Sequence, residues 1–231
     1  MNRPLCCLFA FLFLARGAPL VAGAWLLKEG DQHASIWMGY STSSGYWDRD
    51  GNLKSNSCRS HNESVHYSYE RGISYDYTLM VKLGAKRTHC GGEANEGLSD
   101  MQIGIRGRTN PYKSGRAWEI KAIIPTGYAR RDSRRLGFGR VALEFAVYRG
   151  DSFGNRNYVE WSAGARIYEG PPAHQWRVHV QRGFPLWGPT AKGSVRLSGI
   201  FSWGNGRPEK VVLSAGERLA EFDLVKISVT L

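Results

Sequence analysis

Strict alternation of apolar and polar side chains over residues 75–86 is the feature that most constrains the fold of this chain. Its odd positions are Tyr75, Tyr77, Leu79, Val81, Leu83 and Ala85, and most even positions are polar or glycine. A period of two is typical of a β-strand with one apolar and one polar face. At about 3.3 Å per residue the stretch is about 40 Å long, enough for a tilted strand to cross a bilayer.

The same alternation returns along most of the chain. It predicts further strands at residues 34–41, 64–70, 99–108, 117–124, 140–148, 158–168, 175–181, 193–203 and 222–231. Long polar connections at 44–60, 87–97 and 126–139 alternate with short turns, as in membrane barrels. Residues 211–215 are assigned to a loop, because an additional strand would break the even count. We therefore predict an all-β fold: one antiparallel up-and-down transmembrane β-barrel of about 10–12 strands, formed by residues 25–231.

The two faces of these strands differ in charge. The predicted outward face is nearly free of charge and carries aromatic residues near strand ends, as interfacial girdles do: Tyr40, Tyr67, Tyr69, Tyr75, Trp118, Trp161, Trp176 and Trp203. The predicted lumenal face carries both signs: Lys82, Arg106, Glu119, Lys121, Arg140, Glu144, Glu160, Arg166, Arg177 and Arg196. A small soluble barrel fills its interior with apolar side chains. A soluble β-sandwich or lipocalin-like barrel shares the period of two and is the less favoured alternative.

Residues 1–24 have the pattern of a signal peptide. Arg3 precedes an apolar core at 5–14, and Ala22 and Ala24 fit the small-residue cleavage rule, which predicts Trp25 as the first mature residue. Loss of Arg3 and Arg16 leaves 29 of the 31 basic residues against 20 acidic ones, or +9. For an exported basic chain we expect anionic partners such as outer-membrane lipids, lipopolysaccharide or small solutes, and no nucleic acid. The predicted location is the bacterial outer membrane.

Two cysteines, Cys58 and Cys90, remain after the predicted cleavage, and both lie in polar segments predicted to be outer loops. An oxidising compartment permits a disulfide between them, and two free thiols are equally compatible with the sequence. The residues His61, His66, His89 and Cys90 lack the spacing of a zinc site. We predict neither a metal nor a cofactor.

Three short motifs resemble a known family. The segment Glu96-Gly97-Leu98-Ser99-Asp100 is similar to the EGLGD-type motif of the outer-membrane barrels named for the "MetA-pathway of phenol degradation". Residues 124–128 (IPTGY) resemble its PTG loop, and residues 136–139 (LGFG) resemble its LGxG segment. The resemblance implies an outer-membrane transporter for hydrophobic or aromatic compounds. Family members usually have further strands and an aromatic last residue, whereas this chain ends on Leu231.

The charge pattern and the motifs are compatible with three functions. Rings of inward arginine and lysine attract anions, which favours a channel or transporter for small hydrophobic, aromatic or anionic solutes. Arg106, Lys121, Arg166 and Arg196 are then expected to line the passage. If Glu119, Glu144 and Glu160 instead pair with neighbouring cations, they fill a narrow lumen. A structural barrel would then bind lipopolysaccharide or a partner through its basic loop (Arg130, Arg131, Arg134, Arg135).

A lipid-modifying enzyme is the third hypothesis. It needs a serine, a histidine and an acid or amide brought together. The candidates are Ser64, His66, Ser162 and His179, which occupy ordinary inward positions, and no G-x-S-x-G motif occurs. The sequence therefore predicts that the protein is not an enzyme.

Overall fold

The protein is described by a computed structural model that covers residues 23–47, 53–110, 115–126, 136–154, 157–170, 173–186, 192–204, 212–213, 217–218 and 224–230. Its main strands are β1 (Gln32–Trp47), β2 (Leu53–Ser74), β3 (Tyr77–Cys90), β4 (Glu93–Leu98), β5 (Met101–Arg108), β6 (Arg116–Ile124), β7 (Ala142–Phe153), β8 (Asn157–Tyr168), β9 (His174–Pro185), β10 (Lys192–Trp203) and β13 (Leu224–Thr230). Two further strands of two residues each are β11 (Val212–Leu213) and β12 (Glu217–Arg218). Among these residues there is no helix long and apolar enough to cross a membrane.

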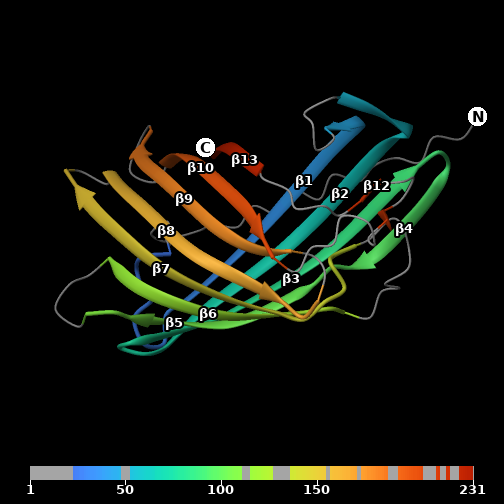
Figure 1. The fold of residues 1–231 in the computed structure, drawn as a ribbon. Coiled ribbons are helices and arrows are strands. Elements are labelled where there is room, and N and C mark those ends of the chain that lie inside the picture. The colour runs from blue at the N-terminus through green and yellow to red at the C-terminus, as the bar shows by residue number, and fades with distance from the viewer. Residues whose placement is uncertain are drawn as a thin grey trace, which may run out of the picture.

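The main strands form one antiparallel sheet in which neighbours in the chain are mostly neighbours in space. The order is β1-β2-β3-β5-β6-β7-β8-β9-β10-β13, and β4 folds back onto the end of β3. The sheet curls into a half-barrel with a concave and a convex face (Figure 1). The predicted all-β, antiparallel, up-and-down architecture is confirmed. Strands β1 and β13 are the two edges, and no pairing joins them among the described residues.

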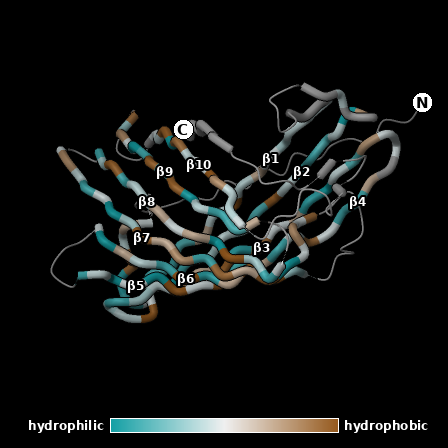
Figure 2. Tube along the Cα trace, in the orientation of Figure 1, coloured by the Kyte–Doolittle hydropathy of each residue, from teal (hydrophilic) through white to brown (hydrophobic). Residues whose placement is uncertain are grey.

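The two faces of the sheet have the polarity that the alternation predicts. Side chains of the convex face are apolar and open to the surroundings: Met38 is 74% exposed, Tyr40 65% and Trp176 53%. In the middle of the sheet, hydrophilic and hydrophobic residues take turns along the strands (Figure 2). This apolar face extends over most of the sheet, far beyond the few hundred Å² that soluble monomers usually expose.

The concave face is polar, and its buried apolar cluster is small. That cluster contains Ile123, Ala142 and Tyr168, with Phe138 packed against it. Charged side chains are buried on the same face, among them Arg106 and Glu119. A soluble barrel of this size would have an apolar interior, so the buried charge distinguishes this half-barrel from that alternative.

Several predicted boundaries are wrong. The expected loops at 44–60 and 87–97 are largely strand, because β1, β2 and β3 continue through them and β4 adds a hairpin. Residues there are polar on both faces, so the period of two gives no signal. Strand β7 begins at Ala142, which leaves Arg140 outside it. Of the predicted loop at 211–215 the structure describes only β11, which pairs with β12 outside the main sheet. The four arginines of the predicted basic loop lie outside the described residues.

Candidate functional site

A ladder of ion pairs crosses the concave face, and strand register builds it. Arg106 lies opposite Glu119 in the β5–β6 pairing, and Lys121 lies opposite Glu144 in the β6–β7 pairing. Glu144 in turn lies opposite Arg166 in the β7–β8 pairing. Directly opposed side chains of opposite charge attract each other across a sheet, so each of these pairs is already oriented by the backbone.

The contacts within the ladder are short. Arg106 places Nη2 2.8 Å from Glu119 Oε2. Lys121 Nζ bridges two carboxylates, at 2.7 Å from Glu119 Oε1 and 2.7 Å from Glu144 Oε1. Arg166 Nε donates to Glu144 Oε2 at 2.6 Å. Buried charges need this kind of pairing, since an isolated ion in such a place is very costly.

Further side chains extend the ladder to β2 and β9. Arg106 Nη1 donates to Glu70 Oε2 at 3.3 Å, and Tyr148 Oη donates to Glu119 Oε1 at 3.1 Å. Arg177 Nε lies 3.5 Å from Glu144 Oε2. Glu70 and Tyr148 are absent from the predicted site, although they share the inward parity of residues that were predicted.

Positive charge remains after these pairs are formed. Within the part of the chain that the structure describes, Lys82 makes no hydrogen bond or ion pair with a carboxylate. Arg196 donates to the amide oxygen of Gln181, which carries no charge to offset it. The concave face therefore combines a neutralised ladder with surplus cations beside it.

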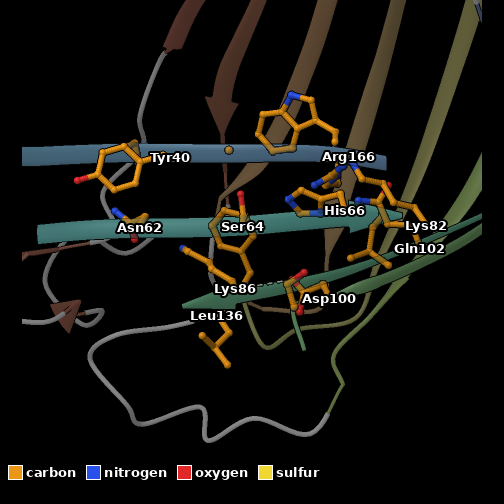
Figure 3. A pocket seen from close by; sticks show the side chains of 17 residues that line it. Tyr40, Asn62, Ser64, His66, Lys82, Lys86, Asp100, Gln102, Leu136 and Arg166 are labelled. Carbon is orange, nitrogen blue, oxygen red and sulfur yellow. Dashed lines mark hydrogen bonds between the residues drawn. The ribbon is translucent and has the colours of Figure 1, made fainter. Parts of the chain in front are cut away.

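Three cavities lie along the concave face, with volumes of about 720, 500 and 370 Å³. Lys82 and Gln102 line all three, so Lys82 stands where they meet. The largest cavity also contacts Trp37, whose ring stacks on that of His66 with centroids 5.2 Å apart. Figure 3 shows Lys82, His66 and Arg166 close together in this cavity.

The residues before β1 cross the end of the half-barrel where β2 turns into β3 and β7 into β8. Ala24 N donates to Glu160 Oε2 on β8 at 2.6 Å, and Leu27 N donates to Thr78 Oγ1 on β3 at 3.1 Å. Gly30 N then donates to Gly72 O at 2.9 Å, next to the start of β1. Residues 23–31 thus span the concave face from one side to the other. Gly23 and Ala24 belong to the predicted signal peptide, so residues 25–31 are the part that narrows this end in the mature protein.

A serine, a histidine and a glutamate meet on β8 and β9. Ser162 Oγ lies 2.7 Å from His179 Nδ1, and His179 Nε2 lies 3.1 Å from Glu160 Oε1. From the sequence, Ser162 and His179 could be recognised only as separate inward residues, without any sign that they contact each other. The register that joins them, with Ser162 opposite His179, cannot be obtained from either strand alone.

Nine of the ten predicted lumenal residues lie on the concave face: Lys82, Arg106, Glu119, Lys121, Glu144, Glu160, Arg166, Arg177 and Arg196. Arg140 is the exception, because it precedes β7 and lines none of the three cavities. Glu119 and Glu144 pair with neighbouring lysine and arginine side chains, as the pairing alternative expected, whereas among the described residues Glu160 pairs with none. What each residue does in a passage remains a prediction.

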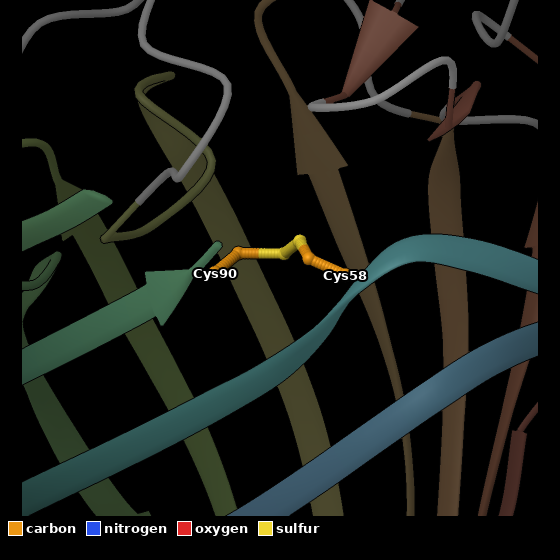
Figure 4. The surroundings of a disulfide bond; sticks show 2 residues. All are labelled: Cys58 and Cys90. Carbon is orange, nitrogen blue, oxygen red and sulfur yellow. A yellow bond between two sulfur atoms is a disulfide. The ribbon is translucent and has the colours of Figure 1, made fainter. Parts of the chain in front are cut away.

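Cys58 and Cys90 are joined by a disulfide with a Cα–Cα distance of 5.5 Å (Figure 4). Their predicted place in outer loops is wrong, since Cys58 lies within β2 and Cys90 is the last residue of β3. The β2–β3 ladder ends at the pair His61 and His89. The disulfide therefore joins the two strands just beyond their last paired residues.

Comparisons with known proteins bear on the fold. No family profile matches the sequence, and no curated protein matches it either. Among solved structures, the chain is similar to an outer membrane channel from Pseudomonas putida F1, with a TM-score of 0.63 and 15% sequence identity. The match covers 78% of this chain and 75% of the channel. This chain therefore has the fold of an outer membrane channel barrel, curled here into a half-barrel.

Proposed function

We propose that this protein is an outer-membrane channel for small anionic solutes, and that aromatic carboxylates are its preferred class. One observation carries the proposal: Lys82 has no carboxylate partner among the described residues and lies where three cavities meet. A cation that the ladder does not neutralise can attract an anion into a lumen, which is how rings of lysine and arginine favour anions in pores.

The location rests on three observations. The convex face is apolar over strands long enough to cross a bilayer. The fold is similar to that of an outer membrane channel. Residues 1–24 have the pattern of a signal peptide, which predicts export. An apolar outer face around a polar interior is the arrangement of outer-membrane barrels, so lipid is the expected environment of the convex face.

The preference for aromatic carboxylates follows from the largest cavity. Trp37 and Phe138 line it together with Lys82 and Arg166. A ring can stack on the aromatic side chains while its carboxylate meets the cations. The cavity volume of about 720 Å³ lies within the range of small-molecule sites.

Permeation into proteoliposomes tests this proposal. We expect benzoate to enter faster than benzyltrimethylammonium, which has the same ring with a fixed positive charge and is likewise excluded by lipid, and Lys82→Gln to slow benzoate several-fold. Arg87→Gln is the matched control, because the Arg87 side chain is 55% exposed and lines none of the three cavities. An unchanged ratio of benzoate to benzyltrimethylammonium in Lys82→Gln would contradict the proposal.

A barrel without an open pore is the second candidate. The ion-pair ladder and the segment 25–31 both occupy space on the concave face. If the inserted wild-type protein passes neither solute, this structural function is favoured over the channel.

A further inference from the structure

Glu160 differs from the other buried carboxylates of the concave face. Glu119 and Glu144 each pair with at least two lysine or arginine side chains. Glu160 is 1% exposed, and among the described residues no lysine or arginine pairs with it. Its partners are His179 Nε2 at 3.1 Å and the backbone nitrogen of Ala24, the last residue of the predicted signal peptide, at 2.6 Å. A buried carboxylate in this position holds the histidine ring that faces it in one orientation.

His179 has a second partner on its other ring nitrogen. Ser162 Oγ lies 2.7 Å from His179 Nδ1. Ser162 is directly opposite His179 in the β8–β9 pairing, and Glu160 is two residues before Ser162 on the same face of β8. Strand pairing therefore holds the serine, the imidazole and the carboxylate in one line.

We propose that Ser162, His179 and Glu160 form a hydrolytic site that cleaves small carboxylic esters within the lumen. The order serine, histidine, buried acid is the arrangement that activates a serine nucleophile on many unrelated folds, where geometry and not sequence position defines it. Here Nδ1 faces the serine and Nε2 faces the acid. A neutral imidazole has two tautomers, and in the one whose proton is on Nε2, Nδ1 can accept a proton.

The surroundings of Ser162 suit this chemistry. Ser162 and His179 line the third cavity, of about 370 Å³, together with Arg177 and Arg196. Negative charge develops on the carbonyl oxygen of an ester when a serine attacks it, and fixed positive groups in a partly dry cavity stabilise that charge. The small volume and the two arginines of this cavity favour esters whose acid portion is small or anionic.

Water is the only co-reactant that this ester hydrolysis needs. Ser162 Oγ bonds to the ester carbonyl carbon while its proton moves to His179 Nδ1. The carbon–oxygen bond to the alcohol then breaks, and the alcohol leaves with that proton. Water attacks the acylated serine, His179 accepts and returns the proton, and the carboxylic acid and free Ser162 are restored.

Labelling with a fluorophosphonate probe tests the site in the full-length protein refolded in detergent micelles. We expect one label on Ser162, lost in Ser162→Ala and strongly reduced in His179→Ala. Ser198→Ala is the matched control: Ser198 lies opposite His179 on β10 but forms no hydrogen bond with it in the structure. Its labelling should equal that of the wild type. An unlabelled wild-type barrel that migrates as folded protein on an unheated gel would overturn the proposal, and so would labelling that persists in Ser162→Ala.

Turnover of p-nitrophenyl acetate tests the positioning role of Glu160. Removing a triad member lowers kcat by roughly 10³-fold or more. We expect Glu160→Gln, which keeps the size and one acceptor oxygen, to lower kcat with little change in KM. A purely structural role would instead lower the amount of folded protein and leave kcat per folded molecule unchanged. Neither assay depends on conduction, so the hydrolytic site and the channel can fail separately.

Discussion

At the scale of single residues, the concave face separates charges that hold the barrel together from charges that are available to a solute. Glu119 is 2% exposed and forms ion pairs with Arg106 and Lys121. Lys82 stands beside this ladder without a carboxylate partner among the described residues. Paired ions that are buried contribute to a unique structure, whereas a cation at a junction of cavities can bind an anion.

Glu119→Ala should therefore destabilise the protein strongly. The variant leaves Arg106 and Lys121 with less compensation in a buried position, and breaking such a pair typically costs about 3–5 kcal/mol. Urea unfolding in micelles, followed by tryptophan fluorescence, measures the change in the free energy of unfolding. Glu96→Ala is the control, because Glu96 pairs with Arg87 at 3.6 Å while 73% exposed. We expect a loss below about 1 kcal/mol there, and equal losses in the two variants would show that the ladder does not stabilise the fold.

The charged positions could be predicted from sequence, but their partners could not. Alternation assigns Arg106, Glu119 and Glu144 to the lumenal face without any structure. Which cation meets which carboxylate depends on register, and a one-residue slip would turn every side chain to the other face. The contact of Ser162 with His179 was missed for the same reason.

At the scale of strands, the predictions are good in the middle of the sheet and poor at its edge. The expected strand at 117–124 corresponds to β6 (Arg116–Ile124), where one face is apolar and the other charged. The expected strand at 64–70 is only part of β2 (Leu53–Ser74). Residues 53–63 are polar on both faces, so they alternate in no property that the sequence shows. Their pairing with β1 keeps them extended.

The disulfide should matter most for these polar strand ends. In a protein with Cys58→Ser and Cys90→Ser together, the β2–β3 ladder still begins at His61 and His89, but the chain beyond it loses its covalent link. We expect faster trypsin cleavage after Arg59, measured by mass spectrometry of the fragments. Cleavage after Arg149 on β7 is the internal control and should keep its rate. If Arg59 stays as resistant as in the wild type, strand pairing alone holds this end.

At the scale of the whole molecule, the open edges of the half-barrel conflict with its apolar convex face. Strands β1 and β13 leave backbone groups without a strand partner among the described residues. Lipid offers no hydrogen bonds, so exposed sheet edges do not occur within the hydrocarbon region. The repeated alternation of apolar and polar residues predicted a closed barrel, and the half-barrel shows the antiparallel order but not the closure.

We therefore expect the edges to be paired once the protein is in a bilayer. Hydrogen exchange of the β1 amides in proteoliposomes measures this pairing. Exchange as slow as in the central strands β5 and β6 would show that β1 has gained a neighbour on its free side. Fast exchange along β1, with slow exchange in β5 and β6, would show that the edge stays open to water and that the lumen is not sealed from the side.

We propose that a surplus of positive charge in the lumen selects anions. The reversal potential of single channels in a planar bilayer with a salt gradient measures this selectivity directly. We predict discrete conductance steps with an anion-selective reversal potential in the wild type, and a reversal potential shifted toward cations in Lys82→Glu. Cation selectivity of the wild type, or the same reversal potential in both proteins, would show that the lumenal cations do not select anions.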